Sequence, residues 1–105
     1  MGYQSQFTLT TGQSNISFGT NALRQNSTGS YNIAMGRYAG YAITGTGSIG
    51  LGQQALYSCT GDHNIHVGYS SSVGTQITTG DRNVVLGYGA TVNDGTADYQ
   101  FASGS

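Results

Sequence analysis

Residues 28–43 read Thr-Gly-Ser-Tyr-Asn-Ile-Ala-Met-Gly-Arg-Tyr-Ala-Gly-Tyr-Ala-Ile, and variants of this pattern occur five times along the chain. Each copy begins with Thr-Gly and has Asn or Ser at its fifth position, Ile or Val at its sixth, a large apolar residue at its eighth and Gly at its ninth. The copies begin at Thr11, Thr28, Thr44, Thr60 and Thr79. Such self-similarity indicates one small structural unit that stacks on itself.

This repeat defines the organisation of the chain. It divides into a partial unit 2–10, units 11–27, 28–43, 44–59, 60–78 and 79–93, and a degenerate unit 94–105. The distance from Thr to the ninth-position Gly is constant, whereas successive Thr are 17, 16, 16 and 19 residues apart. We therefore expect insertions to form loops in the second half of a unit. Because neither end carries an obvious cap, we expect a segment of a longer protein, or ends covered by a partner.

Composition excludes several classes of function. The 105 residues include 18 Gly, no Pro, and only three basic and four acidic side chains, for a net charge of -1. Three Arg cannot neutralise a phosphate backbone, so we expect no nucleic-acid partner. No apolar run approaches the length of a membrane span, so we expect no membrane insertion. Disorder is disfavoured because a disordered linker does not keep apolar and Gly columns in register.

The columns predict short β-strands. Apolar residues at positions six and eight, with a small residue between them, match a strand that has one buried face. The Gly in every unit argues against helix. We predict an all-β fold, a repetitive β-solenoid or β-roll of about six rungs with a 16-residue period. Each rung would contain a short strand, a corner, a second and looser strand, and another corner. Stacking at about 4.8 Å per rung predicts a stub roughly 30 Å tall.

The expected structural core consists of the sixth, eighth and ninth columns. These residues are Ile16, Phe18, Gly19, Ile33, Met35, Gly36, Ile49, Leu51, Gly52, Ile65, Val67, Gly68, Val84, Leu86 and Gly87. The ninth-position Gly would supply a positive φ or a close backbone approach that ends the strand, and the second-position Gly would do the same at the other corner. Asn at the fifth position suits a boundary between turn and strand, and stacked copies would form amide ladders.

A single stack of these rungs is expected to be too thin to persist alone. Each rung buries only a few modest apolar side chains, and this gain is offset by the entropy of ordering its backbone. Three copies around one axis would bury their apolar faces and close the assembly by symmetry. We therefore predict an obligate homotrimer, either intertwined or side by side.

The stretch Asn-Ile-Ala-Met-Gly-Arg-Tyr-Ala at 32–39, preceded by Thr-Gly-Ser-Tyr, resembles the head repeats of trimeric autotransporter adhesins. It is more similar to the Thr-Gly-x-x-Asn-x-x-Φ-Gly-Tyr-x-Ala repeats of bacteriophage tail fibres, because its unit is longer than that of adhesin heads. The resemblance extends from Gly2 to about Val92. It implies a trimeric β-roll or β-helix in an extracellular virion fibre, with other fibre segments and a host cell-surface glycan or protein as partners. It carries over no receptor-binding residues.

Tyrosines are the candidate receptor-binding residues, because they lie mostly outside the expected buried columns. The candidates are Tyr38, Tyr41, Tyr57, Tyr69 and Tyr88. An exposed Tyr combines an apolar ring with a polar tip, as recognition surfaces often do. Packing between the chains of a trimer is an equally open role for them.

His63 and His66 are weak metal candidates, because a His on a threefold axis would be presented three times. Their spacing puts them on opposite faces of a strand, which favours two surface or inter-chain polar residues. Cys59 has no intrachain partner for a disulfide, and its column predicts a packed, inert thiol. Asp62 and Asp81 share the third column and are expected to be turn residues or polar surface residues.

No constellation of residues predicts catalysis. A Gly-rich match at 45–50 lacks the following helix that a dinucleotide site requires, and no nucleophile–base pair or carboxylate pair is defensible. We therefore expect no enzyme and no cofactor. The favoured function is a structural and adhesive segment of a trimeric phage tail fibre that presents or spaces a host-binding surface. The alternatives are the head of a bacterial trimeric adhesin at the cell surface and, more remotely, an ice-binding solenoid, since the opening threonines form one column.

Overall fold

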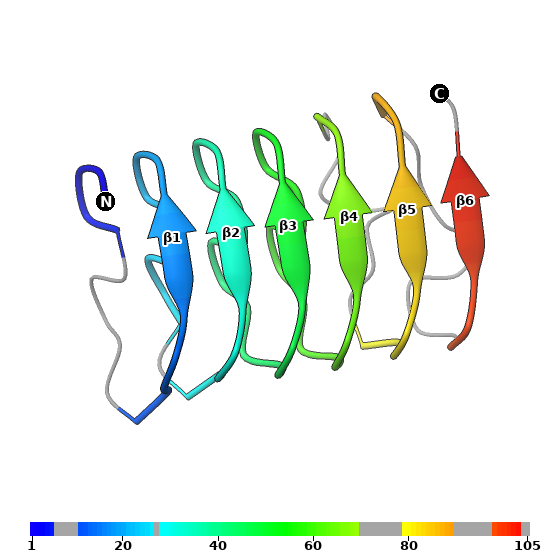
Figure 1. Ribbon diagram of the computed structural model, residues 1–105, viewed down its shortest axis with the longest axis horizontal. Helices are drawn as coiled ribbons and strands as arrows, with labels where there is room; N and C mark the ends of the chain where they lie inside the picture. Colours follow the sequence, from blue (N-terminus) through cyan, green and yellow to red (C-terminus); the bar gives the residue numbers. More distant parts are fainter. Residues whose placement is uncertain (6–10, 27, 70–78, 90–97, 104–105) are drawn as a thin grey trace.

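The computed structural model is an all-β solenoid built from six short parallel strands. It describes residues 1–5, 11–26, 28–69, 79–89 and 98–103, and these residues contain no helix. The strands are β1 (Ile16–Phe18), β2 (Ile33–Met35), β3 (Ile49–Leu51), β4 (Ile65–Val67), β5 (Val84–Leu86) and β6 (Phe101–Ser103). They pair in sequence order into one sheet, each with the next (Figure 1). The longest dimension, 32 Å, runs along the stack, which agrees with the expected height. The predicted fold class is confirmed.

Strand pairing joins equivalent positions of successive units. Ile16 lies opposite Ile33, and Val84 lies opposite Phe101. Phe101 therefore takes the sixth position of the last unit, whose frame begins two residues later than the expected start at 94. The start of this last unit lies outside the described residues, as does most of the second half of unit 60–78, where the longest spacing predicts an insertion. At the other end, the Gly19 amide donates to the Met1 carbonyl at 2.8 Å, which gives Gly2 the ninth position of the partial first unit.

Where the structure describes it, the second half of a rung consists of turns. In the described part of the chain this half contains no strand, so the expected second strand was wrong. Successive turns are joined by backbone hydrogen bonds, such as Leu23 N–H to the Ala39 carbonyl at 3.0 Å. Tyr38 and Gly40 have φ values of 61° and 56°. These left-handed residues curl the chain back on itself, which extended backbone cannot do.

The two glycine columns serve different purposes. Gly36, at the ninth position, has φ 132°, and a Cβ there would lie 2.6 Å from the carbonyl carbon of Gly52. Gly45, at the second position, lacks a positive φ, but a Cβ there would lie 1.9 Å from the Gly61 carbonyl oxygen. The ninth column therefore needs Gly for both its dihedral angle and its close contact, whereas the second needs it because adjacent backbones touch.

The fifth-position Asn ties each rung to the next. Asn32 is fully buried, its Oδ1 accepts the Ser48 amide at 2.8 Å, and its Nδ2 donates to the Gly45 carbonyl at 2.7 Å. Asn64 bonds the following rung in the same way. The expected ladder is present, but its bonds run from amide side chain to backbone. These bonds satisfy buried corner groups that the sheet does not pair.

The seventh-position side chain points into the solenoid. Ala34 and Val85 are each 1% exposed, whereas Ile16 and Met35, at positions six and eight, are 49% and 44% exposed. The expectation that columns six and eight form the core of the chain was therefore wrong. The core is instead formed by small and medium-sized residues, namely Ala22, Leu23, Ala34, Ala39, Ile43, Ala55, Leu56, Cys59 and Val85. The interior also holds the buried Asn column and, at the seventh position of its unit, His66.

Candidate functional site

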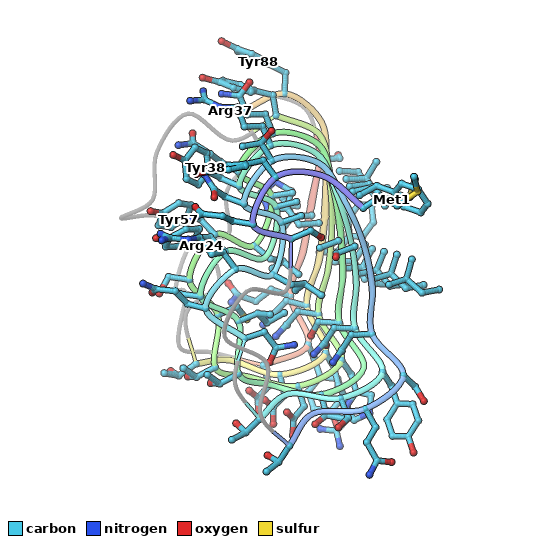
Figure 2. All side chains as sticks on the ribbon, turned by 90° about the vertical axis from the view of Figure 1, so that its left-hand side faces the viewer. Met1, Arg24, Arg37, Tyr38, Tyr57 and Tyr88 are labelled. Carbon is cyan, nitrogen blue, oxygen red and sulfur yellow. The ribbon has the colours of Figure 1, made fainter. Side chains whose placement is uncertain are left out.

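Columns six and eight form a regular apolar surface, the outer sheet face. It takes two side chains from each of β1–β5: Ile16, Phe18, Ile33, Met35, Ile49, Leu51, Ile65, Val67, Val84 and Leu86. All ten are half-buried or exposed, and the parallel register aligns them into two rows. Figure 2 shows these rows projecting from the sheet on the side where Met1 lies. Contiguous exposed apolar surface of this kind marks an interaction site.

The opposite side of the solenoid carries a group of touching side chains, the Arg–Tyr patch. It consists of Arg24, Arg37, Tyr38, Tyr41 and Tyr57. The Arg37 guanidinium carbon lies 4.9 Å from the ring centre of Tyr38, whose ring lies 5.3 Å from that of Tyr41. Tyr41 stacks on Tyr57 at 4.9 Å, and Arg24 Nη1 donates to the Tyr41 hydroxyl at 2.9 Å. Figure 2 shows four of these residues projecting away from the side of Met1.

Rung stacking explains how the patch assembles. Arg24, Tyr41 and Tyr57 occupy the fourteenth position of three successive units, so the solenoid superimposes them. Tyr38 enters from the same turn as Tyr41, through its left-handed backbone. Burial raises the pKa of Tyr57 above 10.0, and the neighbouring Tyr41 and Tyr38 raise it further. The Tyr57 hydroxyl therefore remains protonated at neutral pH and can donate a hydrogen bond.

The other two candidate tyrosines form a separate pair. The rings of Tyr69 and Tyr88 stack at 5.3 Å and 15°, and Tyr88 is 65% exposed. Both occupy the tenth position, which Arg37 holds in its own unit, so the pair follows the same edge of the solenoid. The structure thus divides the five predicted tyrosines into one set of three and one of two.

Sequence reasoning missed the arginines of the patch. The available signal was that Arg24 shares its column with Tyr41 and Tyr57. It also missed the fourth column, where every described residue has a positive φ, including Arg82 at 57° and Tyr99 at 59°. Only one member of that column, Gly47, is a glycine, so the sequence gave almost no indication of the positive φ values. Arg82 lies over the Tyr99 ring at 5.3 Å, a second Arg–Tyr contact outside the patch.

The two histidines differ sharply in environment. His63 is exposed at the fourth position, whereas His66 lies at the seventh position in β4, is 1% exposed and has no hydrogen-bond partner on either ring nitrogen. The expectation of two surface or inter-chain residues was therefore wrong for His66. Burial lowers the pKa of His66 below 6.5, which keeps the ring neutral at neutral pH. Within the described ranges, no three His, Cys, Asp or Glu residues are grouped to hold a metal.

The remaining chemical groups are occupied structurally. Cys59 is buried, and burial raises the pKa of its thiol to about 11, so it is the packed, inert residue that was expected. Of the two roles expected for Asp62 and Asp81, the structure supports the turn residue, since both lie at the corner before a strand. The Asp62 carboxylate accepts the Thr46 amide, and the Asp81 carboxylate accepts the Asp62 amide, both at 2.8 Å. These carboxylates support a second ladder between rungs.

Comparison of the chain with protein-family models, curated proteins and solved structures finds no match. The geometry alone therefore defines the class, a β-solenoid repeat protein with an apolar face and an Arg–Tyr patch on opposite sides. In the ranges that the structure describes, no helix is long and apolar enough to cross a membrane.

Proposed function

We propose that this chain is a structural and adhesive segment of a trimeric bacteriophage tail fibre, which presents or spaces a surface that binds host-cell glycans. The observation that carries the proposal is the outer sheet face, where two rows of apolar side chains lie half-buried or exposed along the stack. The Thr-Gly repeats that resemble those of tail fibres support the biological assignment.

The small size of the core side chains explains why other copies of the chain would cover the outer sheet face. The buried side chains of the interior are mainly Ala and Asn, with few large aliphatic residues. Burying small side chains removes little apolar area from water, so one chain gains limited stability from its own core. The outer sheet face contains no charged residue, so three copies can pack together around an axis without desolvating a charge. The Arg–Tyr patch would then face outward.

The mass of the assembly in solution tests the trimer. We expect three times the chain mass of 10.9 kDa by light scattering at micromolar concentration. Met35→Asp should dissociate or unfold the assembly, whereas Tyr31→Asp, an exposed site outside the outer sheet face, should leave it intact. If the unmodified chain is a folded monomer under these conditions, the proposal of a trimer is wrong, whatever the two variants show.

The location of the protein tests the assignment to a phage. Mass spectrometry of purified virus particles should detect this chain. Its recovery in the outer surface fraction of bacteria, and not in particles, would favour the head of a trimeric adhesin, since that class has the same architecture and a different location.

One observation keeps ice binding as a second candidate. All five opening threonines, Thr11, Thr28, Thr44, Thr60 and Thr79, are exposed in a single column. Their spacing follows the rungs, and regular hydroxyl rows can order water. The column is one residue wide and lies at a corner beside Gly, which disfavours this function relative to the fibre. Measurement of thermal hysteresis separates the two functions, because a fibre segment should show none.

A further inference from the structure

We propose that the Arg–Tyr patch binds a linear polysaccharide that carries carboxylates, such as a polymer of uronic acid, aligned along the stack. This inference rests on the adhesive function proposed above and specifies the class of its ligand.

Arg37 supplies the exposed positive charge of the patch. Its guanidinium lies over the Tyr38 ring at 4.9 Å, and no carboxylate of the described residues pairs with it. The described acids, Asp62, Asp81 and Asp98, precede the strands at the third position, where their carboxylates accept backbone amides. The charge of Arg37 is therefore not balanced locally. A guanidinium presents a planar fork of donors that matches a carboxylate in two parallel hydrogen bonds.

The tyrosines favour a sugar as the carrier of that carboxylate. Tyr41 and Tyr57 stack at 11°, so their facing surfaces are closed and their ring edges are presented instead. Tyr38 is tilted by 53° to Tyr41, and its partly exposed ring adds apolar contact beside Arg37.

The repeat itself favours a polymer over a single sugar. The Tyr41 and Tyr57 ring centres are 4.9 Å apart, because they belong to adjacent rungs. One pyranose in an extended chain advances by a similar length, so successive sugars can meet successive rungs. The stacked pair Tyr69 and Tyr88 extends the same edge of the solenoid toward β5. Repeated weak contacts along a polymer, and on each copy in an assembly, add up through avidity.

The chain provides a matched pair of arginines for the test. Arg37 and Arg82 are both exposed, and each lies over a tyrosine ring, at 4.9 Å and 5.3 Å. Only Arg37 belongs to the patch. Arg37 holds the tenth position of its unit, and the next unit has Gln53 at that position. The fold should therefore tolerate Arg37→Gln.

Binding to polygalacturonate is measured against its fully methyl-esterified form, which keeps the backbone and removes the charge. We expect the unmodified chain to bind polygalacturonate, to lose affinity with added salt and to bind the ester about ten-fold or more weakly. Arg37→Gln should weaken binding by about ten-fold when three copies contribute, whereas Arg82→Gln should have little effect.

Equal binding of both polymers, equal losses in the two arginine variants, or tighter binding to sulfated dextran than to polygalacturonate would each overturn the inference. Failure to bind either polymer would also overturn it, and the fibre proposal would stand if the chain is trimeric and present in particles. A monomeric chain that binds polygalacturonate through Arg37 would support this inference and overturn the proposal of a trimer.

Discussion

Asn32→Ala removes one rung of the asparagine ladder and probes how strongly that ladder holds the solenoid together. Asn32 belongs to unit 28–43, which stacks between units 11–27 and 44–59, and its side chain is fully buried. Its Oδ1 accepts the Ser48 amide at 2.8 Å, and its Nδ2 donates to the Gly45 carbonyl at 2.7 Å. The substitution leaves both of these backbone groups without the partner that satisfies them.

The expected cost follows from counting those two groups. Each buried polar group left unsatisfied costs about 1–3 kcal/mol, so Asn32→Ala should lower the free energy of unfolding by about 2–6 kcal/mol. Asn32→Ser should cost about 1–3 kcal/mol, because a hydroxyl can still accept the Ser48 amide, as Ser48 itself accepts the Asn64 amide at 3.1 Å. The Gly45 carbonyl would be the group left unpaired.

Asn15→Ala provides the position control. The Gly29 carbonyl, which Asn15 contacts at 2.8 Å, also accepts a hydrogen bond from Asn26 at 3.2 Å. The Asn15 Oδ1 also accepts the Asn32 amide at 2.9 Å. Asn15→Ala therefore leaves mainly the Asn32 amide without a partner, and it should lower the free energy of unfolding by about half as much as Asn32→Ala. Urea unfolding followed by circular dichroism measures all three variants at one protein concentration, because the stability of an assembly depends on concentration. A change below about 0.5 kcal/mol for Asn32→Ala would refute the reasoning.

Four further substitutions test the ninth-position glycine and the buried imidazole, each against a control. Gly36→Ala should cost about 2–6 kcal/mol, since its φ is 132° and its Cβ would meet the next rung's backbone at 2.6 Å. Gly89→Ala, with φ 63° and open space around it, should cost about 1–2 kcal/mol in the same urea unfolding measurements. The pKa of His66 is lowered in the fold, so the unfolded chain binds a proton at this residue more readily than the folded chain does. The free energy of unfolding is therefore unaffected by this group above pH 6.5 and falls below it, by up to about 1.4 kcal/mol per pH unit. Urea titrations between about pH 7.5 and pH 5.5 should show that slope abolished in His66→Val and retained in His63→Gln; a slope unchanged in His66→Val would contradict it.

The two-faced cross-section is the feature that links the fold to its proposed use. Positions six and eight project outward from the strand, while the turn at positions ten to fourteen carries Arg37 and the clustered tyrosines to the opposite side (Figure 2). A solenoid can therefore cover one side by self-association and keep the other available for a ligand. Each unit repeats this division, which suits a fibre that contacts a surface along its length.

The sequence by itself determined the period, the parallel register and the need for Gly at the ninth position. These features depend on spacing within one unit, and spacing is visible in a single chain. The sequence also located Asn32 and its equivalents at the boundary between turn and strand. Alternation along Ile33-Ala34-Met35 identified two faces of each strand, because successive side chains point to opposite sides.

Only the tertiary structure decided which of those faces is interior. Hydrophobicity favoured the larger side chains of Ile33 and Met35, yet the strand turns its seventh position toward the interior, where Ala34 and the equivalent His66 and Val85 lie beside buried Asn. The tertiary structure also brought Arg37 into contact with tyrosines, because left-handed backbone in the turns sets where positions ten to fourteen project. Such angles at non-glycine residues leave almost no trace in the sequence, since neighbouring rungs and not local preference impose them.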